Sequence, residues 1–111
     1  MPVVKKSQFR GFKGLEEVVL PEGVTTIDVG AFDGCSGLKE VKLPESLTEL
    51  RTRAYFDCDG LTELSLGEGL VRMGDYAFAD CKNLTKVVAL GIDPGDVALN
   101  AFKGVAEGAM L

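Results

Sequence analysis

The feature that most constrains this chain of 111 residues is a unit that recurs along most of its length, with equivalent positions 23 apart. Residues 31–38 read Ala-Phe-Asp-Gly-Cys-Ser-Gly-Leu, and the alanine, aromatic residue, cysteine and leucine return at residues 54–61 and again at residues 77–84. A repeat period between about 20 and 50 residues is typical of a solenoid, in which each unit buries its apolar side only against its neighbours. The repeat therefore predicts a solenoid, and we call a set of residues at the same place in successive repeats a column.

Three columns of each repeat follow the pattern LxxLxL, where x is any residue. Apolar residues that alternate at the end of this pattern, before a proline or a glycine, predict a short, half-buried strand. Strands from successive repeats should pair in parallel, because the rest of each repeat is longer than the dozen residues that a parallel crossover needs. The three columns are Leu15, Leu38, Leu61 and Leu84, then Val18, Val41, Leu64 and Val87, and then Leu20, Leu43 and Leu66.

The crossover between strands has columns of its own. Apolar pairs that follow a Pro- or Gly-containing turn predict a second short extended segment. Three further columns hold a small residue, an aromatic residue and mostly cysteine, and they are spaced by one and then three residues. This spacing predicts a single helical or 3₁₀ turn. Glycine or asparagine before each LxxLxL strand predicts a left-handed backbone at that place. The columns are Val24 and Ile27 with Leu47, Leu50, Leu70 and Met73; Ala31, Ala54, Ala77 and Ala101; Phe9, Phe32, Tyr55 and Phe78; Phe12, Cys35, Cys58 and Cys81; and Gly14, Gly37, Gly60 and Asn83.

The repeats account for one domain, residues 1–111. Residues 1–14 form a partial repeat, residues 15–90 hold the regular repeats, and residues 91–111 form an irregular last repeat. Terminal repeats must cover the open core with polar surface, and neither end of this chain has the sequence of such a cap. We therefore expect copies of the chain to associate through their repeat ends.

The last repeat slips by one residue relative to the others. Phe102 lies one position later than the period from Phe78 requires, and Val105 stands where the cysteine column would continue. The slip follows a segment that contains Gly91, Pro94 and Gly95. We expect this repeat to be the least regular.

Composition narrows the choice of partners. A formal net charge of -5 argues against nucleic acid and anionic membranes, since both require clustered lysine and arginine. No apolar run is long enough for a membrane span or a secretory signal, so no membrane insertion is expected. The three cysteines recur in one column and no histidine is present, which favours small buried residues over disulfides or zinc ligands.

The columns resemble the BspA-like, or Treponema pallidum-type, class of leucine-rich repeats, whose unit reads roughly LxxVxLPxxLTxIGxxAFxxCxx. The likeness runs from about Val4 to Phe102, and it departs from that unit at Phe12, at Gly67 and at residues 51–53. It implies an α/β leucine-rich-repeat solenoid of about four and a half repeats, right-handed and curved, with a parallel sheet on its concave side. The resemblance also implies a non-catalytic role in binding proteins, at the cell surface or outside the cell.

One acidic column lies on the outward side of the predicted strands. Like charges directly opposite in a sheet are unfavourable, so three glutamates in line predict a binding stripe for a basic peptide or a cation. The alternative, which we favour, is that Lys39, Lys42 and Lys86 neutralise these acids as an ordinary solvated face. The candidate binding residues on this face are Glu17, Glu40, Lys42, Glu63 and Lys86.

Three arginines form a second candidate site. Arg51 and Arg53 replace residues of a turn that other repeats build with glycine, and Arg72 lies one repeat beyond Glu49. Together they could bind an anionic group on the flank of the solenoid. The favoured alternative is that they pair with Glu49 or Asp75.

The sequence contains nothing that predicts catalysis. Histidine, a nucleophile motif and a phosphate-binding glycine loop are all absent from it, so no base and nucleophile are brought within reach of each other. We predict a scaffold that binds a protein, a peptide or another ligand through its strands, without cofactor or metal. The alternative function is a structural module that assembles with copies of itself through uncapped ends.

Overall fold

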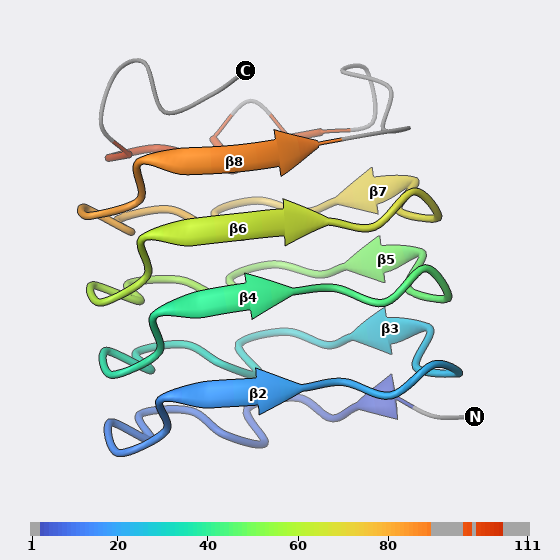
Figure 1. The fold of residues 1–111 in the computed structure, drawn as a ribbon, viewed down its shortest axis with the longest axis horizontal. Coiled ribbons are helices and arrows are strands. Elements are labelled where there is room, and N and C mark those ends of the chain that lie inside the picture. Colours follow the sequence, from blue (N-terminus) through green and yellow to red (C-terminus); the bar gives the residue numbers. More distant parts are fainter. Residues whose placement is uncertain (1–2, 90–96, 99, 106–111) are drawn as a thin grey trace.

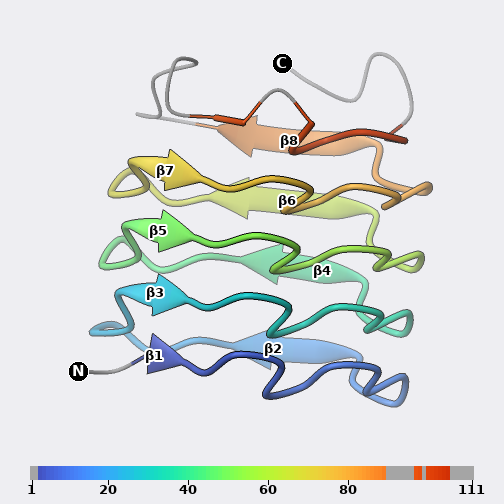
Figure 2. The same cartoon turned by 180° about the vertical axis from the view of Figure 1, so that it is seen from behind.

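The computed structural model of the protein describes residues 3–89, 97–98 and 100–105, and they form a parallel-strand solenoid. The front sheet has the strand order β2-β4-β6-β8, and the back sheet has the order β1-β3-β5-β7. The chain climbs as a right-handed coil, with the front sheet toward the viewer in Figure 1 and the back sheet toward the viewer in Figure 2. The strands are β1 (Val3–Val4), β2 (Glu17–Val19), β3 (Thr26–Ile27), β4 (Glu40–Lys42), β5 (Glu49–Leu50), β6 (Glu63–Leu66), β7 (Arg72–Met73) and β8 (Lys86–Ala89).

Residues of one column lie side by side in both sheets. Every strand pairing joins residues that are 23 apart in the chain, so the period of the sequence is also the period of the coil. The solenoid prediction and the second extended segment are therefore confirmed. The inward columns are Val18, Val41, Leu64 and Val87 in the front sheet, and Val4, Ile27, Leu50 and Met73 in the back sheet.

A ladder of stacked aromatic rings runs through the core from turn to turn. Successive ring centroids are 4.9–5.5 Å apart, and the rings are inclined by only 3–12°. Tyr55 is fully buried in the ladder, and its hydroxyl has no hydrogen-bond partner among the described residues. The ladder consists of Phe9, Phe32, Tyr55, Phe78 and Phe102.

The predicted helical or 3₁₀ turn is wrong, because the described residues contain no helix and this segment consists of successive tight turns. The amides of Phe32 and Gly34 donate to the carbonyls of Ala54 and Phe56 in the next turn, both at 2.8 Å. Gly30 and Gly34 have φ values of 65° and 76°, in the left-handed region. A helix would need each amide to bond within its own segment, and here every second amide bonds to the neighbouring turn instead.

The glycine column has a different role from the predicted one. Gly37 and Gly60 do not have the left-handed backbone that we expected. A Cβ atom at Gly60 would collide with the carbonyl oxygen of Ser36 in the preceding turn, so the position needs a small residue because backbones approach closely. Asn83 belongs to the same column, and its amide donates to the Asp59 carbonyl at 2.7 Å. Among the described residues, the left-handed backbone occurs instead at Ser7, Gly30, Arg53 and Tyr76 in one column, at Gly11, Gly34, Asp57, Asp80 and Gly104 in another, and at Gly23.

The one-residue slip after β8 is confirmed. Met73 bridges to Val97, and the ring of Phe102 stacks on that of Phe78 with centroids 5.5 Å apart. In each of these pairs the two residues are one position further apart in the chain than in the strand pairings, so the last turn keeps the core columns in line despite the extra residue. Gly91, Pro94, Gly95 and residues 106–111 of the predicted irregular repeat lie outside the described residues.

The first turn buries its columns less than the later turns do. Phe12 was expected to fill the buried cysteine position, and it is 52% exposed. Leu15 and Val18 are only half-buried, because β2 has a neighbouring strand on one side alone among the described residues. A side chain at an inward position is therefore fully buried only where neighbouring turns lie on both sides of it.

Candidate binding face

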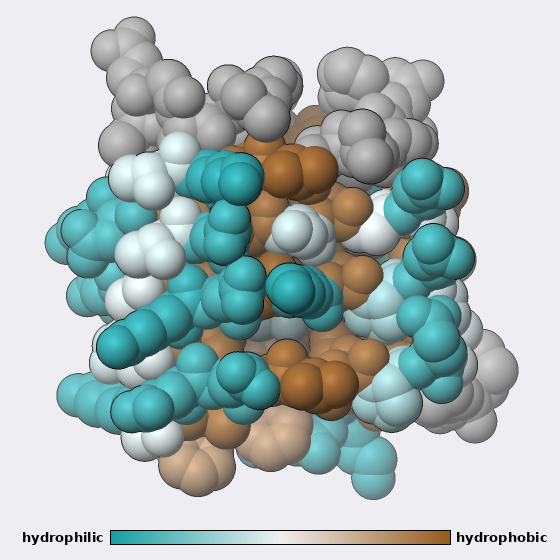
Figure 3. Space-filling view, viewed as in Figure 1, coloured by the Kyte–Doolittle hydropathy of each residue, from teal (hydrophilic) through white to brown (hydrophobic). Residues whose placement is uncertain are grey.

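The outward side chains of β2, β4, β6 and β8 form one continuous surface, which we call the outer face. The predicted acidic column is in register there, with Glu17 beside Glu40, Glu40 beside Glu63, and Glu63 beside Lys86. Two residues further along each strand, a second outward column contains Val19, Lys42, Ser65 and Val88. The structure thus brings together all five residues that the sequence predicted for this face. Figure 3 shows hydrophilic side chains over the strands with apolar surface between them.

Charge is neutralised unevenly along the acidic column. Lys86 Nζ lies 3.2 Å from Glu63 Oε1. The hydrogen bond from Lys86, with the charges of Lys86 and Lys42, holds the pKa of Glu63 below its ordinary value. Among the described residues, Glu17 and Glu40 make no salt bridge. The solvated-face alternative therefore describes the β8 end of the column, and the β2 end keeps two carboxylates available to a partner.

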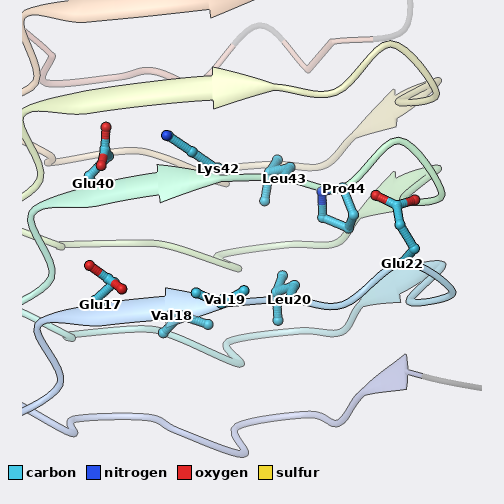
Figure 4. Close-up of a pocket in the computed structure, with 9 residues that line it drawn as sticks. All are labelled: Glu17, Val18, Val19, Leu20, Glu22, Glu40, Lys42, Leu43 and Pro44. Atoms are coloured by element: carbon cyan, nitrogen blue, oxygen red, sulfur yellow. The ribbon is translucent and has the colours of Figure 1, made fainter.

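A hollow of about 330 Å³ lies on the outer face between β2 and β4. Val19 is 80% exposed at its edge, next to Glu17 (Figure 4). The carboxylate of Glu22 accepts hydrogen bonds from the amides of Glu45 and Ser46, both at 3.3 Å, so this acid is already occupied. The hollow is lined by Glu17, Val18, Val19, Leu20, Glu22, Glu40, Lys42, Leu43 and Pro44.

The sequence prediction included three residues of this hollow, Glu17, Glu40 and Lys42, and missed its apolar lining. A signal for Val19 was present, since it stands two residues after Glu17 and so points to the same side of the strand. An apolar residue in an outward column indicates an apolar side chain that stays exposed to solvent in the folded protein. Pro44 follows its strand and carries no such signal.

The three arginines of the flank have separate environments. Arg51 lies 3.3 Å from Asp28 and 3.4 Å from Glu49, and the hydrogen bonds to Glu49 and Asp28 raise its pKa. The Arg53 guanidinium lies 4.8 Å from the ring centroid of Phe56, a cation–π contact. Arg72 stands beside Glu49 in the pairing of β5 and β7. The anion site at Arg51, Arg53 and Arg72 stays a prediction, with Arg51 engaged by two carboxylates.

The cysteine column belongs to the core. All three thiols are free and fully buried, and each donates to the carbonyl of the aromatic residue one turn earlier. For Cys58, the contact with the Cys81 thiol and then burial raise the pKa. The donor to acceptor pairs are Cys35 with Phe9 at 3.2 Å, Cys58 with Phe32 at 3.3 Å and Cys81 with Tyr55 at 3.3 Å.

The part of the chain that the structure describes contains neither a metal-binding cluster nor a membrane-spanning helix. No group of three or more acidic, cysteine or histidine side chains there is arranged to hold a metal ion. No helix within the same ranges has the length and apolar character that crossing a membrane requires.

Comparison with known proteins identifies relatives of this architecture. The family model for the BspA type leucine rich repeat region matches six copies over residues 3–93. The crystal structure of the T. pallidum leucine-rich repeat protein (TpLRR) matches with a TM-score of 0.87 and 30% identity, over 95% of this chain and 50% of that chain. A crystal structure of a leucine-rich repeat protein from Bacteroides ovatus ATCC 8483 matches with a TM-score of 0.74 and 33% identity, over 77% of this chain and 22% of that chain. This chain thus spans half or less of the length of either structure, and no curated protein matches it significantly.

Proposed function

The chain belongs to the BspA-type leucine-rich repeat family, whose repeats generally serve as protein-binding scaffolds, and from this we propose that its outer face binds a basic protein or peptide. The observation that carries the proposal is the uneven neutralisation of the acidic column. Lys86 sits beside Glu63 at 3.2 Å, while Glu17 and Glu40 have no salt bridge among the described residues. A lysine or arginine of a partner would form with Glu17 and Glu40 the kind of ion pair that Lys86 forms with Glu63.

The size of the outer face bears on how strongly it would bind. Four parallel strands at about 4.8 Å spacing span only about 20 Å. A typical stable interface covers about 800 Å² per partner, so we propose that this chain alone binds with modest affinity. Longer arrays of the same repeat would offer more of the same surface. The proposed role is an adhesion-type module without catalysis.

Charge-neutral substitution tests the proposal. Replacing Glu17, Glu40 and Glu63 together by glutamine should abolish binding of a lysine-rich peptide and change the free energy of unfolding by less than about 1 kcal/mol, because the repulsion removed within the column offsets the lost Glu63–Lys86 ion pair. A matched triple variant, Glu45→Gln with Glu68→Gln and Asp75→Asn, changes the net charge equally at exposed positions outside the acidic column. Equal loss of binding in both triple variants would show nonspecific attraction and overturn the proposal.

A second candidate function is end-to-end association of copies through the first turn. The observation that favours it is apolar exposure, since Phe12 is 52% exposed and Leu15 and Val18 are only half-buried. Light scattering across a range of protein concentrations tests it. We expect a dimer or larger species that Phe12→Ser shifts toward the monomer, and a monomer at every concentration would rule this function out.

A further inference from the structure

One arginine and two aromatic side chains form a cluster on the segments that follow strands β5 and β7 (Figure 2), and we call it the arginine cluster. The Arg53 guanidinium lies 4.8 Å from the ring centroid of Phe56 and 5.8 Å from that of Tyr76. The two rings meet edge to face, with their centroids 6.3 Å apart. Arg53 is exposed and both rings are half-buried, so solvent reaches the cluster. Described turns lie on both sides of it.

Two features of the backbone bring these side chains together. Arg53 and Tyr76 belong to one column, and the Arg53 amide donates to the Asp75 carbonyl of the next turn at 2.9 Å. Within its own turn, the Phe56 amide donates to the Arg53 carbonyl at 3.2 Å, which places Phe56 beside the arginine. The cluster is therefore built from two neighbouring turns of the solenoid.

The backbone at Arg53 and Tyr76 is one that large side chains disfavour. Both residues have a φ of 57°, in the left-handed region that glycine adopts without penalty. The preceding position of the same column is Gly30, with a φ of 65°. A side chain in this conformation costs free energy that glycine avoids, and the contact of an exposed guanidinium with a ring offsets only part of that cost. The fold alone therefore does not account for an arginine at this position.

The charge of Arg53 is held in place and is not neutralised. Among the described residues it makes no salt bridge, although the sequence offered Asp75 as a partner. Arg51, by contrast, is engaged by Asp28 and Glu49. A guanidinium presents a planar fork of donors that matches a carboxylate through two parallel hydrogen bonds. Contact with two rings restricts the guanidinium in advance, so less conformational entropy is lost when it binds an anion.

The surroundings of the cluster select the kind of anion. The cluster contains one positive charge, the exposed Asp75 lies in the next turn, and the net charge of the chain is -5. A singly charged carboxylate is therefore favoured over a phosphate group, which carries nearly two charges. The half-buried rings offer apolar surface to a side chain next to that carboxylate. Arginine, tyrosine and phenylalanine are also residue types that are enriched in protein interfaces.

We propose that the cluster of Arg53, Phe56 and Tyr76 binds an acidic segment of a partner protein, with an aspartate or glutamate on the guanidinium and an apolar side chain against the two rings. This partner differs in charge from the one proposed for the outer face, and the inference does not rest on that function. The cluster follows strands of the back sheet, so binding there leaves the outer face of the front sheet free.

A pentapeptide with blocked ends and the sequence Gly-Phe-Glu-Phe-Gly is the probe, and the same peptide with glutamine at its centre is the matched control. NMR titration of the full chain follows the Nε–H resonance of Arg53 and the ring resonances of Phe56 and Tyr76. The glutamate peptide should bind about fivefold more tightly than the glutamine peptide, because the swap removes one ion pair and keeps the apolar contacts. Equal binding of the two peptides would overturn the inference.

Matched arginine variants locate the binding. Arg53→Gln should remove the preference for the glutamate peptide, whereas Arg10→Gln, an equal change of charge at an exposed arginine two turns away, should retain it. Arg53→Lys should retain only part of the preference, since an ammonium group lacks the planar fork. Loss of the preference in Arg10→Gln as well as in Arg53→Gln would show general attraction between opposite charges and overturn the inference.

A glycine variant separates a role in binding from a role in folding. Arg53→Gly should remove the preference with little change in the urea midpoint, because relief of the left-handed backbone offsets the lost ring contact and the greater freedom of the unfolded chain. Replacing Glu17, Glu40 and Glu63 by glutamine should leave the preference unchanged, which distinguishes this site from the outer face. Retention of the preference in Arg53→Gly would place the peptide elsewhere and overturn the inference. A dimer that forms without peptide and is lost in Arg53→Gly would make the occupant a second copy, and would also overturn it.

Discussion

The first turn and the central turns of the solenoid use the same columns, but they bury them to different degrees. Cys35 is fully buried, whereas Phe12 in the same column is 52% exposed. Val41 is 3% exposed, whereas Val18 is half-buried. The difference shows that a repeat of this kind does not bury its own core, since burial comes from the turns above and below it.

The same contrast extends to the charged column on the outer face. Glu63 lies between Glu40 and Lys86, and its charge is met within the chain. Among the described residues, Glu17 lies beside Glu40 alone in this column. Within those residues, the turn with the least covered core is therefore also a turn whose outward carboxylate makes no salt bridge.

The largest expected difference concerns leucines of one column. Leu61→Ala should lower the free energy of unfolding by about 2–5 kcal/mol, because Leu61 is fully buried between two turns. Leu15→Ala should cost only about 1 kcal/mol, because Leu15 is already half-exposed. Urea midpoints measure both, with the exposed Lys39→Ala as a near-neutral control. Similar midpoints for the two leucine variants would remove the contrast between the turns.

A second pair of substitutions tests close backbone approach. Gly60→Ala should cost about 1–3 kcal/mol, because the new methyl group collides with the Ser36 carbonyl of the preceding turn. Gly14→Ala should be neutral or slightly stabilising, since a methyl group there meets only the ring edge of Phe12 at 3.7 Å. Thermal or urea unfolding measures both variants. A destabilisation of the same size at both positions would point to a backbone requirement and contradict our steric explanation.

The glycine column also shows how far the sequence could predict the fold. The repeat period was sufficient for the solenoid, the parallel pairing and the inward columns, because each of these depends only on which residues are equivalent. Close approach between Gly60 and Ser36 depends on the distance between turns, and a sequence pattern does not contain that distance. The left-handed backbone was expected at Gly60 and occurs at Arg53, a residue type that does not signal it, and at Asp57, a residue type that favours it more than most.

The candidate site was predictable in its charge and not in its shape. Glu17, Glu40 and Glu63 follow from alternation along strands of known register. The hollow next to Val19 depends on how two neighbouring strands and the residues after them are placed in space, which a sequence pattern does not give. The ends of the array were the least predictable part, because burial there depends on which neighbours are present.

The third prediction concerns pH and the buried thiols. Contact with Cys81 and burial raise the pKa of Cys58, and burial raises that of Cys35. A thiol with a raised pKa in the folded state contributes stability that is complete below its unfolded pKa of about 8.5 and is lost as the pH rises above it. The free energy of unfolding should thus fall above about pH 8.5, by up to about 1.4 kcal/mol per pH unit for each such thiol.

Urea midpoints between pH 7 and pH 10 check this dependence, and Cys58→Ala should make it shallower. The first turn supplies a matched contrast in thiol reactivity. Phe12→Cys, placed in a chain whose native cysteines are alanine, should react quickly with a thiol reagent in the folded state, whereas Cys58 should react only on unfolding. Fast labelling of Cys58 in the native chain would contradict its burial.

The smallest expected effect concerns one oxygen atom in the aromatic ladder. Tyr55 is fully buried and its hydroxyl has no partner among the described residues, so Tyr55→Phe should keep the stacked rings and raise the free energy of unfolding by about 1 kcal/mol. Phe9→Tyr adds the same hydroxyl in the first turn, where the ring is half-buried, and should change stability little because water can reach the group. Thermal unfolding of the two variants measures whether a buried hydroxyl lowers stability more in a central turn, which has turns on both sides, than in the first turn. A loss of stability in Tyr55→Phe would mean that the hydroxyl has a partner, such as a buried water, and that the central turns tolerate polar atoms as well as the first turn does.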